Sequence, residues 1–181
     1  MKKLTYNEIF SERIKIDAAK TIQRHPVKVL LHNIRSLYNV GSMFRTCDSA
    51  LVDELILCGY TPHPPRKEIE KTALGAVDTV PWRYAESALE TVRELKAQGI
   101  KVFAVELTDE KRRFDDYSLE DFPVCLVMGN EISGVDDDII AECDSSVEIP
   151  MYGVKHSLNV GVASGISIYG AVEKWRELAA L

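Results

Sequence analysis

Residues 27–58 read VKVLLHNIRSLYNVGSMFRTCDSALVDELILC, and this stretch predicts a strand, a helix and a second strand in succession. Its first six residues, Val27–His32, form a short apolar run of strand length, and Glu54–Cys58 forms another. A helix is predicted over Val40–Leu51, where one side carries apolar residues at helical spacing, namely Met43, Phe44, Cys47 and Ala50. A helix that joins two apolar strands is typical of a parallel sheet.

The same alternation continues toward both ends of the chain. Upstream, residues 3–23 have loosely helical apolar spacing and predict a helix that ends before Pro26. Three prolines between Thr61 and Arg66 predict a loop. The later elements are expected in the order strand 79–84, helix 85–98 with Gly99 as its C-terminal cap, strand 101–107, strand 124–128, helix 136–142, strand 147–149 and helix 157–178. This pattern predicts an α/β domain with a parallel sheet covered on both faces.

Length and composition limit the class of protein. The chain has 181 residues, of which 46% are apolar, and this is enough for one sizeable core. No repeat, low-complexity tract or Pro/Gly-rich linker divides it, so we expect a single domain over residues 1–181. Within it, residues 1–25 are expected to form a basic helical extension and residues 27–176 the core. The apolar runs are short and interrupted, so no segment of about 20 residues is expected to cross a membrane.

Charge is unevenly distributed along the chain. The formal net charge is −6, but residues 1–45 hold nine Lys or Arg against three acids, and the remainder therefore carries −12. A basic N-terminal quarter on an acidic body can place a binding face for an anionic partner. A solvated basic helix accounts for the same distribution without any function, so charge alone leaves both interpretations open.

The cysteines and histidines argue against a metal site and against disulfides. The four cysteines are far apart in sequence: Cys47, Cys58, Cys125 and Cys143. Without a C-x-x-C pair they predict neither a zinc site nor a disulfide framework, and they indicate a reducing cytoplasm. The four histidines are also scattered and form no H-E-x-x-H motif, so no metal is expected. Residues 1–10 lack the apolar stretch of a secretory signal, which agrees with a cytoplasmic location.

Several familiar catalytic motifs are absent. The sequence has no G-x-G-x-x-G dinucleotide loop and no G-x-S-x-G nucleophile elbow. Gly129 and Gly134 have the spacing of a phosphate-binding P-loop, but Val135 and Asp136 follow where that loop needs Lys and then Ser or Thr. The acids at 136–138 begin a predicted helix, where negative charge complements the helix dipole, so a metal role is the weaker interpretation.

Three segments instead combine small residues with Asn, Ser, Arg or Glu, and each follows an apolar strand. They are Asn33–Asp48 (NIRSLYNVGSMFRTCD), Met128–Val135 (MGNEISGV) and Ile149–Gly165 (IPMYGVKHSLNVGVASG). Ligands of open α/β sheets bind beyond the carboxyl ends of the strands. Glycine in such loops lets a ligand approach the backbone closely. The three segments therefore predict a binding site.

In this order, the three segments resemble motifs 1, 2 and 3 of the SpoU (TrmH-type) branch of the SPOUT RNA methyltransferases. Motif 1 of that family places an Arg six residues after an Asn, as Asn39 and Arg45 are placed here. Motif 2, M-G-x-E-x-x-G, matches residues 128–134. Motif 3, I-P-M-x-G-x-x-x-S-L-N-V-x-x-A, matches residues 149–163. Three ordered motifs at compatible spacing are more specific than any one of them, and the resemblance covers residues 27–175.

The resemblance implies a fold and a reaction. The fold is a Rossmann-like parallel-sheet domain of the SPOUT type, whose C-terminal segment is threaded into a deep trefoil knot. The enzyme, with residues 27–176 as its catalytic core, would transfer the methyl group of S-adenosylmethionine to a ribose 2′-hydroxyl of RNA. We expect tRNA as the substrate, with rRNA as the first alternative and a non-catalytic RNA-binding protein of the same fold as the second. No metal is required, because the methyl group is borne by an electrophilic sulfonium.

A homodimer is implied by the resemblance and favoured by the last predicted helix. Five apolar residues follow one another along that helix at i, i+4, i+7, i+10 and i+13: Val162, Ile166, Tyr169, Val172 and Trp175. One sheet face cannot bury all of them without a partner, and two-fold dimers are the commonest soluble oligomers. Motif 1 is expected nearby, so each active site would draw on both chains.

For the cofactor, the resemblance implies six residues in three loops: Leu107, Gly129, Ile149, Met151, Ser157 and Leu158. Gly129 is expected to let the cofactor approach the backbone, and Met151 to add backbone contacts. Ile149 and Leu158 are expected to form apolar walls for adenine. Ordinary core packing is the alternative role for these two residues.

Five residues are implied to be catalytic: Arg45, Asn39, Glu131, Ser157 and Asn159. Arg45 is either a base or an electrostatic anchor, and a guanidinium pKa above about 12 favours the anchor, which would grip a phosphate and the hydroxyl oxygen. Asn39 is expected to orient Arg45 or the ribose, or to cap a helix. A carboxylate repels phosphate, so Glu131 is expected to orient Arg45 or Asn159 rather than touch RNA. Ser157 is also a candidate cap for the last helix, with Asn159 in the first turn.

RNA affinity is expected from the N-terminal helix, from the loop around residues 66–71 and from the partner chain. The cations assigned to it are Lys15, Lys20, Arg24, Arg66, Lys67 and Lys71. Residues 71–76 resemble a loop that the family carries after its second strand. Because the body of the protein is acidic, we expect modest affinity that falls steeply with salt.

Overall fold

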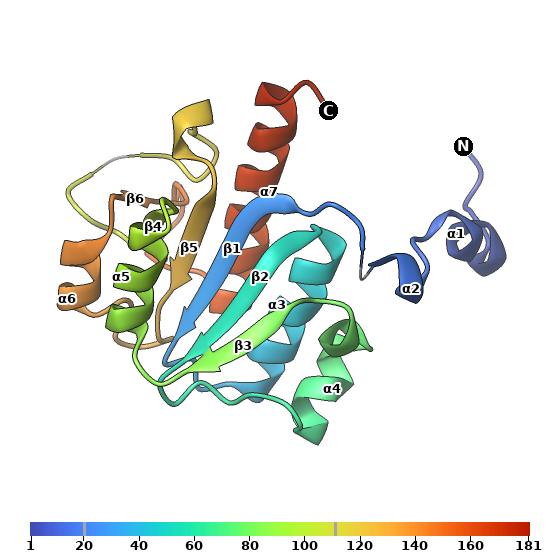
Figure 1. Ribbon diagram of the computed structural model, residues 1–181, viewed down its shortest axis with the longest axis horizontal. Helices are drawn as coiled ribbons and strands as arrows, with labels where there is room; N and C mark the ends of the chain where they lie inside the picture. Colours follow the sequence, from blue (N-terminus) through green and yellow to red (C-terminus); the bar gives the residue numbers. More distant parts are fainter. Residues whose placement is uncertain (20, 111) are drawn as a thin grey trace.

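A six-stranded sheet forms the centre of the computed structural model, which describes residues 1–19, 21–110 and 112–181 (Figure 1). Every strand pair in this sheet is parallel, and the spatial order is β3-β2-β1-β5-β4-β6. The strands are β1 (His25–His32), β2 (Val52–Cys58), β3 (Trp82–Ala85), β4 (Lys101–Val105), β5 (Val124–Met128) and β6 (Ser145–Val147). The predicted α/β domain with a parallel sheet is confirmed.

Helices cover both faces of this sheet. On one face, α3 (Leu37–Ser49), α4 (Lys67–Ala73) and α7 (Val160–Leu178) share a core with the strands. On the other face, α5 (Ala88–Ala97) and α6 (Asp137–Glu142) build a second core. The central strands are buried from both sides, and this explains their nearly continuous apolar sequences. Two short 3₁₀ turns complete the described elements, at Ala76–Asp78 and Leu119–Asp121.

Strands β1 and β2 and helix α3 form the unit that residues 27–58 predict. Ser36 caps α3, since its hydroxyl accepts a hydrogen bond of 3.3 Å from the backbone N–H of Asn39. The helix therefore begins at Leu37, three residues before the predicted start. Asn39 lies within the first turn, so its alternative role as a helix cap is wrong.

Helix α4 is an element that the sequence analysis did not predict. It follows the proline-rich loop directly, and its residues Ile69 and Ala73 are buried. Gly41 of α3 makes the close crossing of the two helices possible, because a Cβ at that position would lie 2.3 Å from the carbonyl oxygen of Ile69. The helix is only seven residues long, too short for its apolar spacing to stand out in the sequence.

The predicted helix over residues 3–23 is wrong. Two short helices, α1 (Tyr6–Glu12) and α2 (Ile16–Ala19), take its place, and Arg13 between them is extended. None of the residues of α1 is buried, and the helix stands away from the sheet in Figure 1. Apolar residues at loose spacing gave a helical pattern there without a core face to stabilise one long helix.

The later elements lie within a few residues of their predicted positions. Gly99 adopts the left-handed conformation, with φ of 79°, immediately beyond α5, and this confirms its predicted place at the end of that helix. Helix α7 begins at Val160 because the side chain of Asn159 accepts hydrogen bonds from the N–H groups of Gly161 and Val162. The expectation that Ser157 caps this helix is therefore wrong. Among the described residues, no helix is both long and apolar enough to cross a membrane.

Candidate active site

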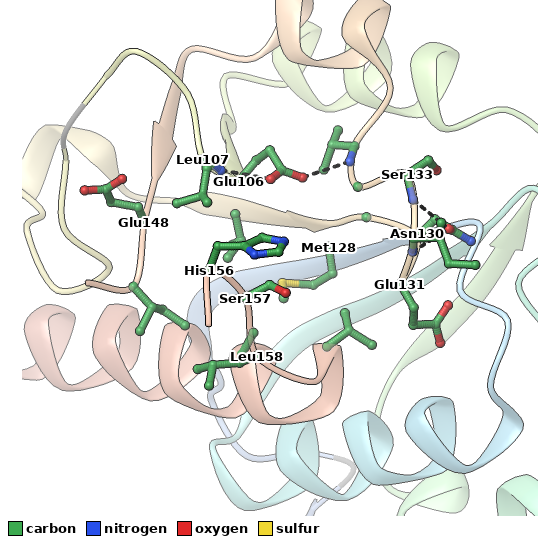
Figure 2. A pocket seen from close by; sticks show the side chains of 18 of the residues that line it. Glu106, Leu107, Met128, Asn130, Glu131, Ser133, Glu148, His156, Ser157 and Leu158 are labelled. Atoms are coloured by element: carbon green, nitrogen blue, oxygen red, sulfur yellow. Dashed lines mark hydrogen bonds between the residues drawn. The ribbon is translucent and has the colours of Figure 1, made fainter. Parts of the chain in front are cut away.

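A cavity of about 660 Å³ opens at the carboxyl ends of β4, β5 and β6. This is the edge of an open parallel sheet at which ligands bind. Its lining comes from the ends of those three strands, the loops that follow them and the first turn of α7. Figure 2 shows Glu106 and Leu107 across the cavity from Ser157 and Leu158.

All six residues that the sequence assigned to the cofactor line this one cavity: Leu107, Gly129, Ile149, Met151, Ser157 and Leu158. Ile149 and Met151 are half-buried, and Leu158 is 38% exposed. Ordinary core packing, the alternative for Ile149 and Leu158, would have buried both side chains, and it does not fit these exposures. The structure brings together residues that are far apart in sequence.

The loop after β5, residues 128–135, folds back on itself. The backbone groups of Asn130 and Gly134 exchange two hydrogen bonds, of 2.9 and 3.0 Å. A Cβ on Gly129 would lie 2.2 Å from the carbonyl carbon of Gly134 and 2.3 Å from the nitrogen of Val135. One close approach that requires a glycine here is therefore made by the chain itself, and Gly129 also lines the cavity.

Asn130 fixes this loop to its surroundings, and the sequence analysis missed it. Its buried side-chain amide donates to the carbonyl of Asn33 at 2.7 Å and to the hydroxyl of Tyr60 at 2.9 Å. Its side-chain oxygen accepts from the N–H groups of Ile132 and Ser133. All its hydrogen-bonding groups are thus used, as a buried amide requires. Its place between the glycine and the glutamate of motif 2 was the available signal.

Glu106 joins the loops that follow β4 and β5, and it was also missed. One carboxylate oxygen accepts from the N–H of Leu107 at 2.9 Å, and the other accepts from the N–H of Val135 at 3.1 Å. Gly134, with φ of 73°, leaves the space that this carboxylate fills, because a Cβ there would lie 2.2 Å from it. A glutamate directly after the apolar strand 101–105 was the sequence signal.

A chain of side chains connects the three motifs. Glu131 accepts hydrogen bonds from the backbone N–H groups of Arg35 and Ser36, at 2.9 and 3.1 Å, and from the amide of Asn39 at 3.0 Å. Asn39 in turn accepts from the amide of Asn159 at 3.3 Å. Glu131 thus holds the start of α3, and the expectation that it orients Arg45 or Asn159 directly is corrected. Through Asn39 it reaches the cap of α7.

The Glu131 carboxyl is held in its charged form. Burial acts to raise its pKa, but the hydrogen bonds from the Arg35 N–H, the Asn39 amide and neighbouring backbone groups outweigh burial. The net result is a pKa below the ordinary value of 4.5. The link between motifs 1 and 2 is therefore anionic at neutral pH.

Arg45 lies outside the cavity lining, on α3 six residues beyond Asn39. Its side chain is exposed, and within the described part of the chain its guanidinium makes no hydrogen bond or ion pair. Asn39 contacts Glu131 and Asn159 instead, which corrects the expectation that Asn39 orients Arg45. The guanidinium is free for an external anion.

The cavity is acidic. Four carboxylates belong to its lining, Glu106, Glu131, Asp137 and Glu148, whereas no Lys or Arg of the described residues does. Such a lining favours a positively charged ligand and disfavours a phosphate, because opposite charges attract across a low-dielectric cavity. Apolar side chains complete the walls, so the ligand it suits has an apolar or aromatic part and a cationic part.

The cations assigned to RNA differ in their surroundings. Lys15, Arg66, Lys67 and Lys71 are exposed, and Lys20 lies outside the described residues. Arg24 is different, because its guanidinium donates to the carbonyls of Val52, Ala19 and Thr79 at 2.6–3.0 Å. These bonds tie the N-terminal segment to the sheet.

The remaining acidic and metal-binding candidates concern possible metal sites and the start of α6. The described residues contain no group of three or more His, Cys, Asp or Glu that could hold a metal ion. In the acidic run at 136–138, the Asp136 carboxylate contacts the imidazole of His32 at 2.9 Å and does not cap α6.

Comparison with known proteins gives consistent matches. The model of the SpoU rRNA Methylase family matches residues 26–169. A tRNA (guanosine(18)-2′-O)-methyltransferase of Aquifex aeolicus is 32% identical over 150 residues, 82% of this chain and 70% of that protein. The 23S rRNA (guanosine-2′-O-)-methyltransferase RlmB of Ralstonia nicotianae is 33% identical over 155 residues, 84% of this chain and 61% of that protein.

A solved structure extends these matches to three dimensions. The AdoMet-bound rRNA methyltransferase from Sinorhizobium meliloti superposes with a TM-score of 0.76 at 28% identity. The superposition covers 88% of this chain and 59% of that one. The chain thus spans about 60% of the length of the two rRNA-modifying proteins.

Proposed function

Because the chain belongs to the SpoU rRNA methylase family, we propose that it transfers the methyl group of S-adenosylmethionine to a ribose 2′-hydroxyl of RNA, with tRNA as its substrate. One observation carries the proposal: the six residues assigned to the cofactor from sequence line one acidic cavity. The reaction class is supported by the relatives, which are named for 2′-O-methylation of tRNA or rRNA guanosine. The alternative of a non-catalytic protein is disfavoured, because the three motifs are intact and hydrogen bonds link Asn39 of motif 1 to Glu131 and Asn159, which line the cavity.

The cavity residues fit this cofactor. Its sulfonium and ammonium groups are cationic, which suits a lining that has four carboxylates and, among the residues that the structure describes, no Lys or Arg. Leu107, Ile149 and Leu158 offer apolar walls for adenine, and about 660 Å³ lies within the range of small-molecule sites. When bound, the cofactor supplies a methyl group on a positively charged sulfur, which is electrophilic without a metal.

The residues of the chain then supply position and electrostatics. We assign Arg45 to an RNA phosphate and the 2′-hydroxyl oxygen, where its positive charge favours the alkoxide over the neutral hydroxyl. Glu131 and Asn39 hold the start of α3 against the cap of α7, so that the two helices and the cavity keep one geometry. Ser157 lines the cavity with an exposed hydroxyl, which keeps it among the proposed catalytic residues.

We also propose the trefoil knot and the homodimer. The knot is supported by the family and by the contribution of both 128–135 and 147–160 to one cavity. The dimer is supported by α7, whose Val162 and Tyr169 are 53% and 42% exposed although both are apolar. It would also let a second chain bring its Arg45 to the cavity, which the Arg45 of the same chain does not line. Light scattering at micromolar concentration should give about twice the 20.3 kDa chain mass, and a stable monomer would exclude the dimer.

The cytoplasm is the compartment that we propose. This proposal is supported by the four cysteines, all of which are free thiols, because a reducing environment keeps thiols from forming disulfides.

Two measurements test the function. Calorimetry should show binding of S-adenosylmethionine or its demethylated product, and no binding at millimolar ligand would remove the enzyme assignment. Mapping of 2′-O-methyl groups in cellular tRNA and rRNA, with and without the protein, should show one missing mark in tRNA. If the missing 2′-O-methyl group is in rRNA, the proposed reaction is supported and the assignment of tRNA as the substrate is wrong.

A further inference from the structure

Three aromatic rings lie at the carboxyl ends of β2 and β3, beside the candidate active site. Tyr60 and His63 belong to the loop after β2, and Tyr84 belongs to β3. Tyr60 is 61% exposed and Tyr84 is 44% exposed, and His63 is also exposed. Rings that remain in water add little to the stability of the fold, because the hydrophobic gain comes from burial. We call these three residues the aromatic platform.

The rings are held in place although their faces are exposed. The hydroxyl of Tyr84 donates to the carbonyl of Gly59 at 2.9 Å, and its ring lies 4.8 Å from that of His63, centroid to centroid. The hydroxyl of Tyr60 accepts from the amide of Asn130, and the backbone N–H of Tyr60 donates to Asn33 at 3.1 Å. A ring fixed by its hydroxyl loses little further entropy when a flat ligand stacks on it.

The aromatic platform is continuous with the cavity. Asn130, which holds the hydroxyl of Tyr60, is the residue that fixes the cavity loop 128–135. Because Asn130 itself lines the cavity, one hydrogen bond joins Tyr60 of the platform to the cavity lining. A base stacked on Tyr60 would therefore lie beside the cavity lining.

The charges around the platform indicate the kind of ligand. Arg35, Arg66 and Lys67 are exposed, and no ion pair of theirs occurs within the described residues. Arg35 lies two residues beyond Asn33, Arg66 ends the loop that carries His63, and Lys67 begins α4. Glu86, two residues beyond Tyr84, is exposed, so a phosphate backbone would follow the side with the arginines.

Aromatic faces flanked by unpaired cations suit single-stranded nucleic acid, whose bases stack on rings while its phosphates meet the cations. We propose that the aromatic platform stacks unpaired bases of the RNA substrate next to the ribose that is methylated. This inference rests on the proposed function, and it adds that the target lies in a single-stranded part of the RNA. Bases inside a duplex already stack on each other and leave no face for the platform.

Tyr84 is the residue on which the proposal is best tested. Replacement of Tyr60 would disturb Asn130 and thus the cavity, whereas Tyr84 contacts only Gly59 and His63 among the bonds described. Tyr84→Leu removes the ring, and Tyr84→Phe, the matched control, removes only the hydroxyl. The probe is a short single-stranded oligoribonucleotide with 2-aminopurine, whose fluorescence is quenched by stacking, and the comparison is a duplex of the same sequence.

The wild-type protein should prefer the single strand and quench its fluorescence. Tyr84→Leu should weaken single-strand binding by about 5- to 150-fold, the range for one lost stacking contact, and should reduce the quenching. Tyr84→Phe should stay close to wild type, duplex binding should be unchanged, and cofactor affinity should be equal in all three proteins.

Three results would overturn the proposal: no preference of the wild type for the single strand, unchanged binding and quenching in Tyr84→Leu, or equal losses for strand and duplex. The proposed function fails separately, by absence of cofactor binding in the wild type. An active enzyme in which Tyr84→Leu leaves the KM for RNA unchanged would refute the platform and keep the function.

Discussion

Replacement of Gly129 by alanine should damage cofactor binding more than folding. The added Cβ would lie 2.2–2.4 Å from three backbone atoms of Gly134 and Val135, against at least 3.4 Å for ordinary contact. The loop must open by about 1 Å to accept it, which breaks the two backbone hydrogen bonds between Asn130 and Gly134. Two bonds at about 1 kcal/mol each and a strain of about 1–3 kcal/mol give roughly 3–5 kcal/mol.

This energy should appear mainly in the affinity for the cofactor. If S-adenosylmethionine binds only the closed loop, a cost of 3–5 kcal/mol raises Kd by roughly 150- to 4,000-fold. Isothermal titration calorimetry measures the change, and thermal unfolding shows whether the fold survives. Gly153→Ala is the matched control in motif 3, since a Cβ there would meet no atom within 4 Å. A Gly129→Ala protein that binds the cofactor within twofold of wild type would refute the reasoning.

Four further predictions follow from the site and the fold. Arg45→Ala should lower turnover at saturating RNA by about 100-fold and leave cofactor affinity unchanged, and Arg45→Lys should restore little of the lost turnover. Full turnover in Arg45→Ala would exclude the proposed role. The pKa of Glu131 is lower in the folded protein than its ordinary value, so the ionised carboxylate stabilises the fold by about 1 kcal/mol after screening. This contribution is fully present at a pH above the ordinary pKa, and it is lost as the pH falls through the folded pKa. Denaturant unfolding at pH 7 and at pH 3 should therefore show a smaller difference for Glu131→Gln than for wild type, and equal differences would contradict the assignment. Arg24→Ala should cost about 2 kcal/mol and lower Tm by about 5 °C through loss of three carbonyl contacts, and an unchanged Tm would show that the tie is not made in solution. Burial raises the pKa of the buried Cys58 to about 11 and that of the half-buried Cys143 to about 12, so a thiol reagent at pH 8 should label neither quickly before unfolding, and rapid labelling of either would contradict its raised pKa.

The sheet could be predicted because its signal is local. Each buried strand is a short apolar run, and the runs at 27–32, 54–58 and 124–128 stand out between polar loops. The N-terminal helices and α4 were mispredicted because their apolar spacing is weak, and their extent depends on tertiary contacts that no local pattern contains. Helix starts were set by caps, Ser36 and Asn159, rather than by the first apolar residue.

The candidate site was predictable as a set of residues and not as a set of contacts. Motif spacing selected Asn39, Glu131 and Asn159, but no periodicity states that Glu131 bonds to the start of α3. For Gly129, the atoms that exclude a side chain lie five and six residues further along a folded loop, and no local pattern contains that contact. Glu106 and Asn130 act by joining loops, and this role becomes visible only in three dimensions.

The pairing of β1 with β5 has a consequence for how the chain folds during its synthesis. During translation β1 leaves the ribosome together with α3, β2 and β3, and these can pair at once, but the other edge of β1 must wait for β5. Until then the nascent chain carries an open apolar strand edge, the feature that recruits chaperones or leads to aggregation. Every loop of the cavity is synthesised after β1, β2 and β3. The nascent chain therefore cannot bind its cofactor before synthesis is nearly finished. Abundant S-adenosylmethionine should therefore stabilise completed chains only.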